Sequence, residues 1–584
     1  MPPKNHGAIT ANRSKYVNTE VKMKFKKIIC LSLAFAFALS ATACGNRDNG
    51  DVKINESQTQ LYVSFYAGGI GTEWFNEAVR GFEAKYAETS FEDGKKGVQI
   101  VPDTNKSTTA GDTLLAGLST NTNDVYFTEG VYYYDIIAKN GAADITDIVT
   151  GKASEFGEEK SIESKMDQSL IDFYKTEEGK YYAIPYYEGY DGFIYNVQLF
   201  EDECLYFKED YRNAEYLDDM FISKLGDKKS KGPDNIEGTS DDGLPATYDD
   251  FYKLCERMVD LGITPFIWAG MYDYVTTYAA YEMWADYEGK DQFYLNFSFD
   301  GTATDIVKSI DNGKVTLESP VTITNDNGVD VQKQQGKYEV LKFWENIMRP
   351  ADETDRFYHD LSFSPSMSNT NAQATFLTGI VDSTKRIGML VDGNWWEREA
   401  ESIGSFTSLA NRGYNKSDLR FGFMPFPKAD DSKLGDKRTL VSVNDSICFV
   451  SGKSTGARLK LAKLFLQYCH TDEMLQNFSV YTNIMKPYNY EISKENQAKL
   501  TYFGREMYDI KNNDNVDVVY PYSNNEVFLN NFAEFHPYNW AFTIPEGNSV
   551  AAVYKDNKTM TVESYFSKLY AAYKPKWSTY LSKI

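Results

Sequence analysis

The chain has little of what most catalytic and metal sites are built from. Among 584 residues there are four histidines and six cysteines, and no two cysteines have the spacing of a zinc or redox motif. Two histidines, His6 and His359, fall in segments composed like a leader and a loop. No GxSxG or HExxH motif occurs, and the Gly-Lys-Ser at 452–454 lacks the earlier glycine of a phosphate-binding loop, because Ile447 stands there.

Positive charge is also scarce. Lysine and arginine number 61 against 84 acidic residues, which gives a formal net charge of −23. This balance disfavours nucleic acid and an anionic membrane surface as the main partner. Aromatic residues are abundant instead, with 43 tyrosines, 36 phenylalanines and 8 tryptophans. The length is sufficient for two or more domains with sizeable cores.

The first 43 residues have the pattern of a secretory signal peptide. From Met23 three lysines precede an apolar run, Ile28 to Leu39, which is followed by small residues. This run is too short to span a bilayer stably. We therefore predict that Met23 is the true start and that residues 1–43 are removed on export.

The four residues "ATAC" (41–44) resemble a bacterial lipobox, with Ala41 in place of the usual leucine. We predict that Cys44 carries lipid, including palmitate, and that residues 44–60 form a polar flexible tether. The predicted location is the extracytoplasmic face of the cell membrane. Ordinary secretion, with Cys44 unmodified, is the alternative.

The other cysteines of the exported chain are predicted to be mainly buried free thiols. Cys255 and Cys469 fall on apolar faces of expected helices. A Cys204–Cys255 or Cys448–Cys469 disulfide remains open outside the cell.

Helical and strand patterns alternate along the chain, which indicates the α/β class. The clearest unit is 244–270. There Thr247 with Asp250 predicts a helix start, Gly262 predicts the helix end, and "TPFIW" predicts a strand. Strands are also expected at 61–69 and 123–130, each followed by a helix. Another helix is expected at about 456–469, and Gly141 is expected to close the helix after residue 130.

Several segments, in this order, resemble the extracellular solute-binding proteins of ABC importers, the family typified by maltose-binding protein. They are "YYAIPYYEGYDGFIYNVQLFE" (181–201), "PATYDDFYKLCERMVDLGITPF", "ATFLTGIVDSTKRIGMLVDGNWWERE" (374–399), "RFGFMPFPKAD" and "TLVSVNDSICFVSGKST". The resemblance covers most of residues 60–500. The segments 202–243 and 286–345 exceed the family's usual length.

The resemblance implies a two-lobed fold of the type II periplasmic-binding-protein kind, with the ligand in an interlobe cleft. It assigns 61–190 plus 443–490 to lobe one, and 191–442 plus 491–584 to lobe two. The implied function is capture of a carbohydrate and its delivery to a membrane permease, by a monomer with no catalytic role and no required cofactor. The aromatic content favours an oligosaccharide.

The candidate ligand residues are aromatic rings for stacking on sugar faces and carboxylates for hydroxyl groups. Trp395 matches the family's stacking tryptophan, and Trp396 either extends this platform or packs behind it. A core role for the pair is the alternative. The further candidates are Tyr187, Glu188, Tyr190, Asp191, Trp268, Tyr272, Glu129, Trp74 and Trp540. Asn444 and Asp445 are expected to act as hinge hydrogen-bonding residues.

The loop "GPDNIEGTSDDG" (232–243) offers a second kind of site. Asp234, Asn235, Asp241 and Asp242 are either oxygen ligands for Ca²⁺ or parts of a solvated acidic turn. The spacing does not follow the EF-hand pattern.

Three other functions remain open from the sequence. A peptide or another polar solute is the first alternative ligand. An anchored glycoside hydrolase would need two facing carboxylates in the cleft. A structural adhesin would have no interlobe cleft.

Overall fold

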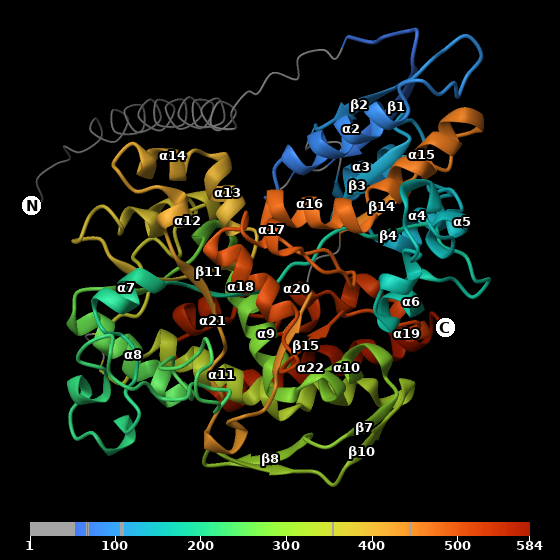
Figure 1. The fold of residues 1–584 in the computed structure, drawn as a ribbon. Coiled ribbons are helices and arrows are strands. Elements are labelled where there is room, and N and C mark those ends of the chain that lie inside the picture. Colours follow the sequence, from blue (N-terminus) through green and yellow to red (C-terminus); the bar gives the residue numbers. More distant parts are fainter. Residues whose placement is uncertain (1–52, 66, 68, 106–109, 353–354, 443–445) are drawn as a thin grey trace, which may run out of the picture. The chain divides into compact units, whose positions relative to one another are not determined.

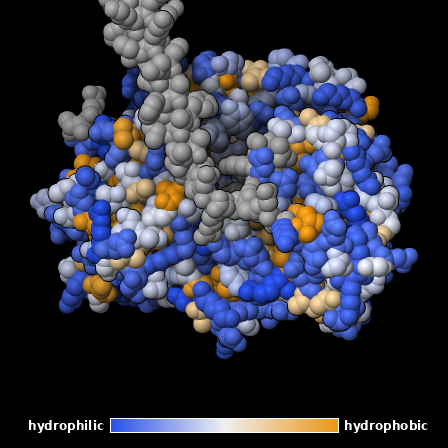
Figure 2. All heavy atoms as spheres, turned by 90° about the horizontal axis from the view of Figure 1, so that it is seen from above, coloured by the Kyte–Doolittle hydropathy of each residue, from blue (hydrophilic) through white to orange (hydrophobic). Residues whose placement is uncertain are grey.

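The structure is a computed structural model that describes residues 53–584, except 66, 68, 106–109, 353–354 and 443–445. Cys44, Asn444 and Asp445 lie outside the described residues. Within the described part, no helix has both the length and the apolar character required to cross a membrane. Figure 2 shows a mainly hydrophilic face with small, separate apolar spots.

A five-stranded mixed sheet forms the first half, in the order β2-β1-β3-β14-β4. β1 pairs in parallel with β2 and β3, whereas β14 runs antiparallel to β3 and β4. Four strands come from the start of the chain and the fifth returns from far downstream. Their bounds are β1 Thr59–Phe65, β2 Val98–Asp103, β3 Val125–Thr128, β4 Ile184–Pro185 and β14 Ile447–Val450.

The first sheet is covered by helices from residues 73–174 and by two helices from residues 456–482. In Figure 1, α15 and α16 (orange) lie beside the blue segment that contains α2, and contacts join α15 to β1 and α16 to α2. The helices are α2 Glu73–Lys85, α3 Gly111–Gly117, α4 Tyr133–Ala138, α5 Thr146–Thr150, α6 Gln168–Tyr174, α15 Gly456–Tyr468 and α16 Asp472–Thr482.

The second half contains a four-stranded sheet in the order β12-β5-β11-β6. The chain leaves the first sheet at Pro185 and enters the second at Asp191, so residues 186–190 cross between them. Both faces are buried: Phe193 of β5 belongs to one core cluster and Ile194 to another. The strands are β5 Asp191–Asn196, β6 Thr264–Ile267, β11 Ile387–Gly393 and β12 Phe421–Met424.

The central helix of this half is α9 (Val275–Glu288), which contacts β5, β11 and α11. Most of its residues are buried, including Glu282 and Asp286, as expected for a helix without a solvent face. Around the second sheet lie α7 Val197–Asp202, α8 Tyr248–Asp260, α12 Asn369–Thr378, α13 Trp396–Ser402, α14 Ser405–Ala410 and α18 Tyr502–Lys511, whereas α17 Lys494–Gln497 packs against α16 of the first half.

The segment 286–345, residues 438–441 and the C-terminal part add structure to the second half. They contribute two antiparallel pairs, β7–β10 and β8–β9, while β13 pairs in parallel with β15. Their elements are α10 Lys290–Ser298, β7 Gly301–Ala303, β8 Val307–Asp311, β9 Lys314–Leu317, β10 Val321–Ile323, α11 Gln335–Met348, β13 Arg438–Val441, β15 Val516–Val519, α19 Glu526–Asn530, α20 Pro537–Trp540, α21 Val550–Asp556 and α22 Val562–Leu581.

Local sequence signals account for α8 and its surroundings. Thr247 and Asp250 form the expected reciprocal capping box, and Gly262 adopts the left-handed conformation (φ 67°) after the helix. The strand predicted at "TPFIW" is β6. These signals act within a few residues of each other, so the sequence alone could predict the unit.

Two element boundaries differ from expectation, and the state of the cysteines is resolved. β1 begins at Thr59, whose side chain is fully buried, so the strand starts within the segment expected to be a tether. The left-handed residue after α4 is Asn140, and Gly141 donates its N–H to the Ile136 carbonyl. All four described cysteines are free thiols, and Cys204 is only partly buried.

Candidate functional site

Hydrogen bonds hold the crossing segment, residues 186–190, against the first half. The Tyr187 hydroxyl donates to Glu129 Oε2 at 2.6 Å, which connects the crossing to the end of β3. The Tyr187 N–H donates to Ser446 Oγ, and the Ser446 hydroxyl donates to the Tyr187 carbonyl. Tyr187 and Glu129 were predicted independently as ligand residues, and the structure brings them into contact.

Glu188 lies at the centre of the crossing and is fully buried. Its Oε1 accepts hydrogen bonds from Lys511 Nζ at 2.8 Å and from the Tyr520 hydroxyl at 2.5 Å. Lys511 ends α18, so this ion pair connects the crossing to the second half. The arrangement gives Glu188 Oε1 a structural role, whereas Oε2 is buried without a hydrogen-bond partner among the described residues.

Asp191 begins β5 and lies directly opposite Gly393 of β11. Burial raises the pKa of Asp191 to about 7. Its backbone N–H donates to Glu282 Oε1, and Glu282 also accepts the N–H of Val441. Burial raises the pKa of Glu282 well above its ordinary value, so two carboxyl groups with a strong tendency to stay protonated lie together at this point.

The end of β11 explains the Gly-x-Trp pattern. A Cβ atom on Gly393 would lie 2.3 Å from the Trp395 ring, so only glycine allows the indole to fold over the strand. Asn394 exchanges hydrogen bonds with the backbone of Tyr190, which fixes this turn against the crossing. The Trp395 ring is half-buried, and it is therefore the one predicted tryptophan with an accessible surface.

A second carboxyl pair lies beneath this turn. Gln373 Nε2 donates to Asp392 Oδ2 at 2.9 Å and to Glu399 Oε2 at 2.8 Å. Burial, followed by the charge of Glu399, raises the pKa of Asp392 well above its ordinary value. The amide thus holds two carboxyl groups close together while at least one tends to keep its proton.

A row of tyrosines lies at the start of α9, on the second half. The ring centroids of Tyr272 and Tyr274 are 5.9 Å apart, those of Tyr274 and Tyr278 5.6 Å, and those of Tyr274 and Tyr538 5.3 Å. Tyr272 and Tyr538 are exposed. Burial raises the pKa of Tyr274 to about 12, with smaller effects from Tyr272 and from the charge of Asp191.

Contacts between the two halves occur on more than one side of the crossing. Arg398 of α13 donates to Glu73 of α2 at 2.5 Å. Tyr132 of the first half contacts Phe532 of the C-terminal part edge-on, with centroids 5.2 Å apart. A groove of about 510 Å³ also lies where the halves meet, and Lys511 and Tyr520 line it together with Tyr488.

A family comparison identifies the kind of protein to which this architecture belongs. The family described as bacterial extracellular solute-binding protein matches residues 68–365, just over half of the 584 residues. The chain belongs to this family. Its members are solute-binding receptors that act outside the cytoplasm, and the resemblance stated from the sequence is confirmed.

Solved structures of similar fold exist, whereas no curated protein sequence matches. RafE from Streptococcus pneumoniae is similar at 14% identity and a TM-score of 0.49, over 90% of this chain and 99% of RafE. The GacH receptor of Streptomyces glaucescens is similar at 12% identity and a TM-score of 0.48, over 89% of this chain and 99% of GacH. RafE has been solved with raffinose and GacH with acarbose.

Four predicted ligand tryptophans of this solute-binding protein are core residues instead. Trp396 packs among Phe376, Phe406, Phe421 and Phe503, and it is fully buried. Trp396 is therefore a core residue and does not extend a stacking platform beside Trp395. Each of the other three lies in an aromatic cluster with no surface for a solute: Trp74, Trp268 and Trp540.

Sequence reasoning missed most of the tyrosine row. It selected Trp540 from "FHPYNW", but Trp540 is buried and Tyr538 of the same segment is exposed. It selected Tyr272 but not Tyr274 or Tyr278, although "MYDYVTTY" (271–278) concentrates tyrosines beside the start of α9. Tyr190, another candidate, is buried against the turn that carries Asn394.

The acidic side chains of the loop 232–243 do not form a set of Ca²⁺ ligands. Asp234, Asp241 and Asp242 each accept a backbone N–H of their own loop, from Ile236, Asp234 and Gly238 respectively. Asn235 sits in the left-handed conformation of a turn. Within the described residues, no group of three or more His, Cys, Asp or Glu side chains is placed to hold a metal ion.

Proposed function

We propose that this solute-binding protein captures an oligosaccharide between its two halves and delivers it to the permease of an ABC importer. The observation that carries the proposal is the row formed by Tyr272, Tyr274, Tyr278 and Tyr538 at the start of α9. Trp395 adds a half-buried indole at the end of the strand opposite Asp191.

This combination of groups suits a sugar better than a peptide. A sugar ring has apolar C–H faces and hydroxyl groups at its edge. Stacking that removes ~100 Å² of apolar surface from water contributes on the order of 2–3 kcal/mol. A hydroxyl can donate to Glu129, whereas a peptide chain also needs an edge of unpaired backbone groups.

Ligand binding favours the state in which both halves contact the solute. Glu129 lies on the first half, and Trp395 and Tyr274 lie on the second, so a ligand that touches all three favours their approach by its differential contacts. The Arg398–Glu73 ion pair joins the halves in the same arrangement. Recognition by the permease would then depend on this approach.

The proposal includes attachment to the membrane through lipid on Cys44 and action as a monomer. Two acyl chains are needed for stable attachment, since a single chain gives only marginal binding. A polar tether after Cys44 would keep the receptor near the permease. We do not assign a catalytic role to any carboxyl group.

A thermal-shift screen against neutral oligosaccharides and peptides tests the ligand class. An oligosaccharide at 100 times its dissociation constant should add ~2.7 kcal/mol of stability. Stabilisation by peptides alone would contradict the proposal. Chromatography of the same sugars after incubation separates receptor from hydrolase: the receptor returns them uncut, and cleavage products would favour the glycoside hydrolase instead.

A further inference from the structure

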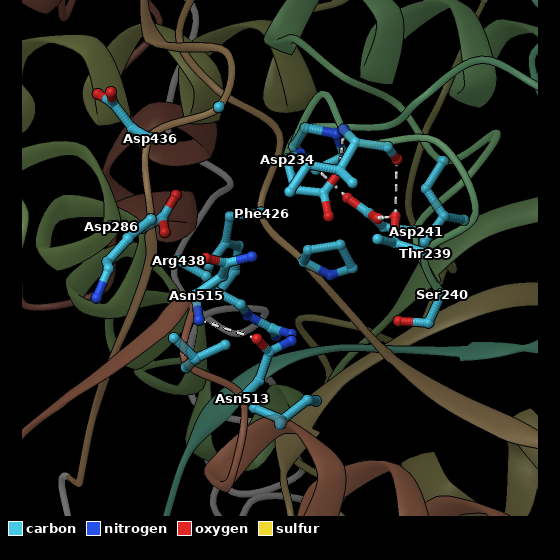
Figure 3. A pocket seen from close by; sticks show the side chains of 18 of the residues that line it. Asp234, Thr239, Ser240, Asp241, Asp286, Phe426, Asp436, Arg438, Asn513 and Asn515 are labelled. Carbon is cyan, nitrogen blue, oxygen red and sulfur yellow. Dashed lines mark hydrogen bonds between the residues drawn. The ribbon is translucent and has the colours of Figure 1, made fainter.

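The second half contains a cavity of about 300 Å³ whose lining includes neither Glu129, Asp191 and Trp395 nor any tyrosine of the row described above. Figure 3 shows its two walls. Asp234, Thr239 and Asp241 stand on one side, and Arg438, Asn513 and Asn515 stand on the other. The first wall belongs to the loop 233–244, which is part of the segment that exceeds the family's usual length.

Two polar atoms on the second wall lack partners. Arg438 Nε and Glu506 Oε2 are both buried, and neither has a hydrogen-bond partner among the described residues. Other atoms of the same side chains have partners: Arg438 Nη2 donates to the Met424 carbonyl, and Glu506 Oε1 accepts the N–H of Phe423. Buried polar groups are normally satisfied, so two orphaned atoms on one cavity wall indicate a missing ligand.

The rest of the lining limits the charge of that ligand. Lys428 and Asp286 pair with each other at 2.9 Å, so they leave no net charge for a ligand. Arg438 disfavours a cation, and Asp234 and Asp241 disfavour an anion. Burial raises the pKa of Glu506 to about 8, so this group is mainly neutral at pH 7.

Apolar surface completes the cavity. Phe423 and Phe426 line it together with Ile510, and the Arg438 guanidinium lies 5.2 Å from the centre of the Phe423 ring. Ligand pockets of proteins usually measure about 300–1,000 Å³, so this cavity is at the lower limit. A ligand of single-ring size, with an apolar face and hydroxyl groups that both donate and accept, matches the lining.

We propose that this cavity is a second binding site, separate from the junction of the two halves, for a neutral polyhydroxylated molecule of monosaccharide size. Arg438 Nε donates to a ligand hydroxyl, Glu506 Oε2 pairs with a neighbouring hydroxyl, and the phenylalanine rings contact the C–H face. The extra loop 233–244 closes the site on the other side.

Saturation-transfer NMR on the purified full chain tests the site, with D-glucose, D-galactose and N-acetyl-D-glucosamine as neutral probes. L-Glutamate and L-arginine serve as charged probes. We expect transfer to at least one sugar and none to the charged probes. Ser240→Trp, which fills the cavity from its rim, should weaken that binding at least tenfold.

Two variants serve as controls. Glu237 lies in the same loop, is exposed and does not line the cavity, so Glu237→Trp should leave the binding unchanged. Trp395→Ala should also leave it unchanged, which separates the cavity from the junction. The proposal is overturned if no sugar shows transfer, if Ser240→Trp has no effect, if Trp395→Ala abolishes the signal, or if a charged probe is bound in place of the sugars.

Discussion

Individual buried carboxyl groups give this protein a definite dependence on pH. Because burial raises the pKa of Asp191 to about 7, the folded protein keeps a proton that the unfolded chain releases from about pH 4 upward. Between these values the folded state binds more protons, so its stability falls as the pH rises. Above about pH 7 this loss is complete.

Asp191→Asn should remove that dependence. The variant cannot ionise, so its stability relative to the wild type should increase by roughly 2–3 kcal/mol between pH 5 and pH 8. Urea unfolding at the two pH values measures the difference. If variant and wild type differ in stability by the same amount at pH 5 and pH 8, Asp191 has its ordinary pKa in the folded protein.

The Glu188–Lys511 pair should matter more than any exposed ion pair. Lys511→Met leaves Glu188 buried without its cation and should cost about 3–5 kcal/mol. Lys499→Met is the control, because Lys499 and Glu495 form a largely exposed pair that is worth ~0–1 kcal/mol. If urea unfolding shows the same loss of stability for both variants, the structural role assigned to Glu188 is wrong.

At the scale of single elements, α8 shows how a local signal fixes a helix start. The Thr247 hydroxyl and N–H both donate to Asp250 Oδ2, and Asp250 N–H donates back to Thr247 Oγ1. Thr247→Ala should cost ~1 kcal/mol in urea unfolding, whereas Thr247→Ser keeps the hydroxyl and should cost less. A loss of the same size for both variants would show that the methyl group, not the cap, matters.

The sequence predicted elements of this kind because their signals are local. Caps, glycine stops and apolar periodicity identified α8, β6 and α15 without reference to the rest of the chain. The turn with Gly393 and Trp395 was also predicted, because the resemblance covers it. β1 begins at Thr59 and not at the predicted residue 61, because pairing with β2 determines where this polar segment becomes a strand.

The ligand residues were harder to predict because exposure is set by distant packing. Trp396 and Trp395 are neighbours, yet four phenylalanines from three helices and a strand bury the first. Tyr538 reaches Tyr274 across more than 260 residues of sequence, and no local pattern signals that contact. Glu188 is a residue type that often binds ligands, but only the fold shows that Lys511 donates a hydrogen bond to it.

At the scale of the whole molecule, attachment to the membrane is separate from binding. Cys44→Ser removes the thiol that would carry lipid, so the variant should appear in the medium or remain unprocessed. Cys204→Ser is the control, because Cys204 is a free thiol of the folded part and should not affect attachment. Fractionation and immunoblotting measure the outcome, and a Cys44→Ser protein that stays in the membrane after normal processing would refute the lipid anchor.

Capture of an oligosaccharide at the junction of the two halves is the central claim, and titration calorimetry tests it most directly. The best oligosaccharide from the thermal-shift screen is titrated into the wild type, Trp395→Ala and Tyr216→Ala. Tyr216 is an aromatic control, because its ring is 66% exposed and lies in the segment 202–243. Loss of one stacking contact should weaken binding about thirty- to a hundredfold in Trp395→Ala and leave Tyr216→Ala unchanged. Equal affinity in all three proteins would contradict the account.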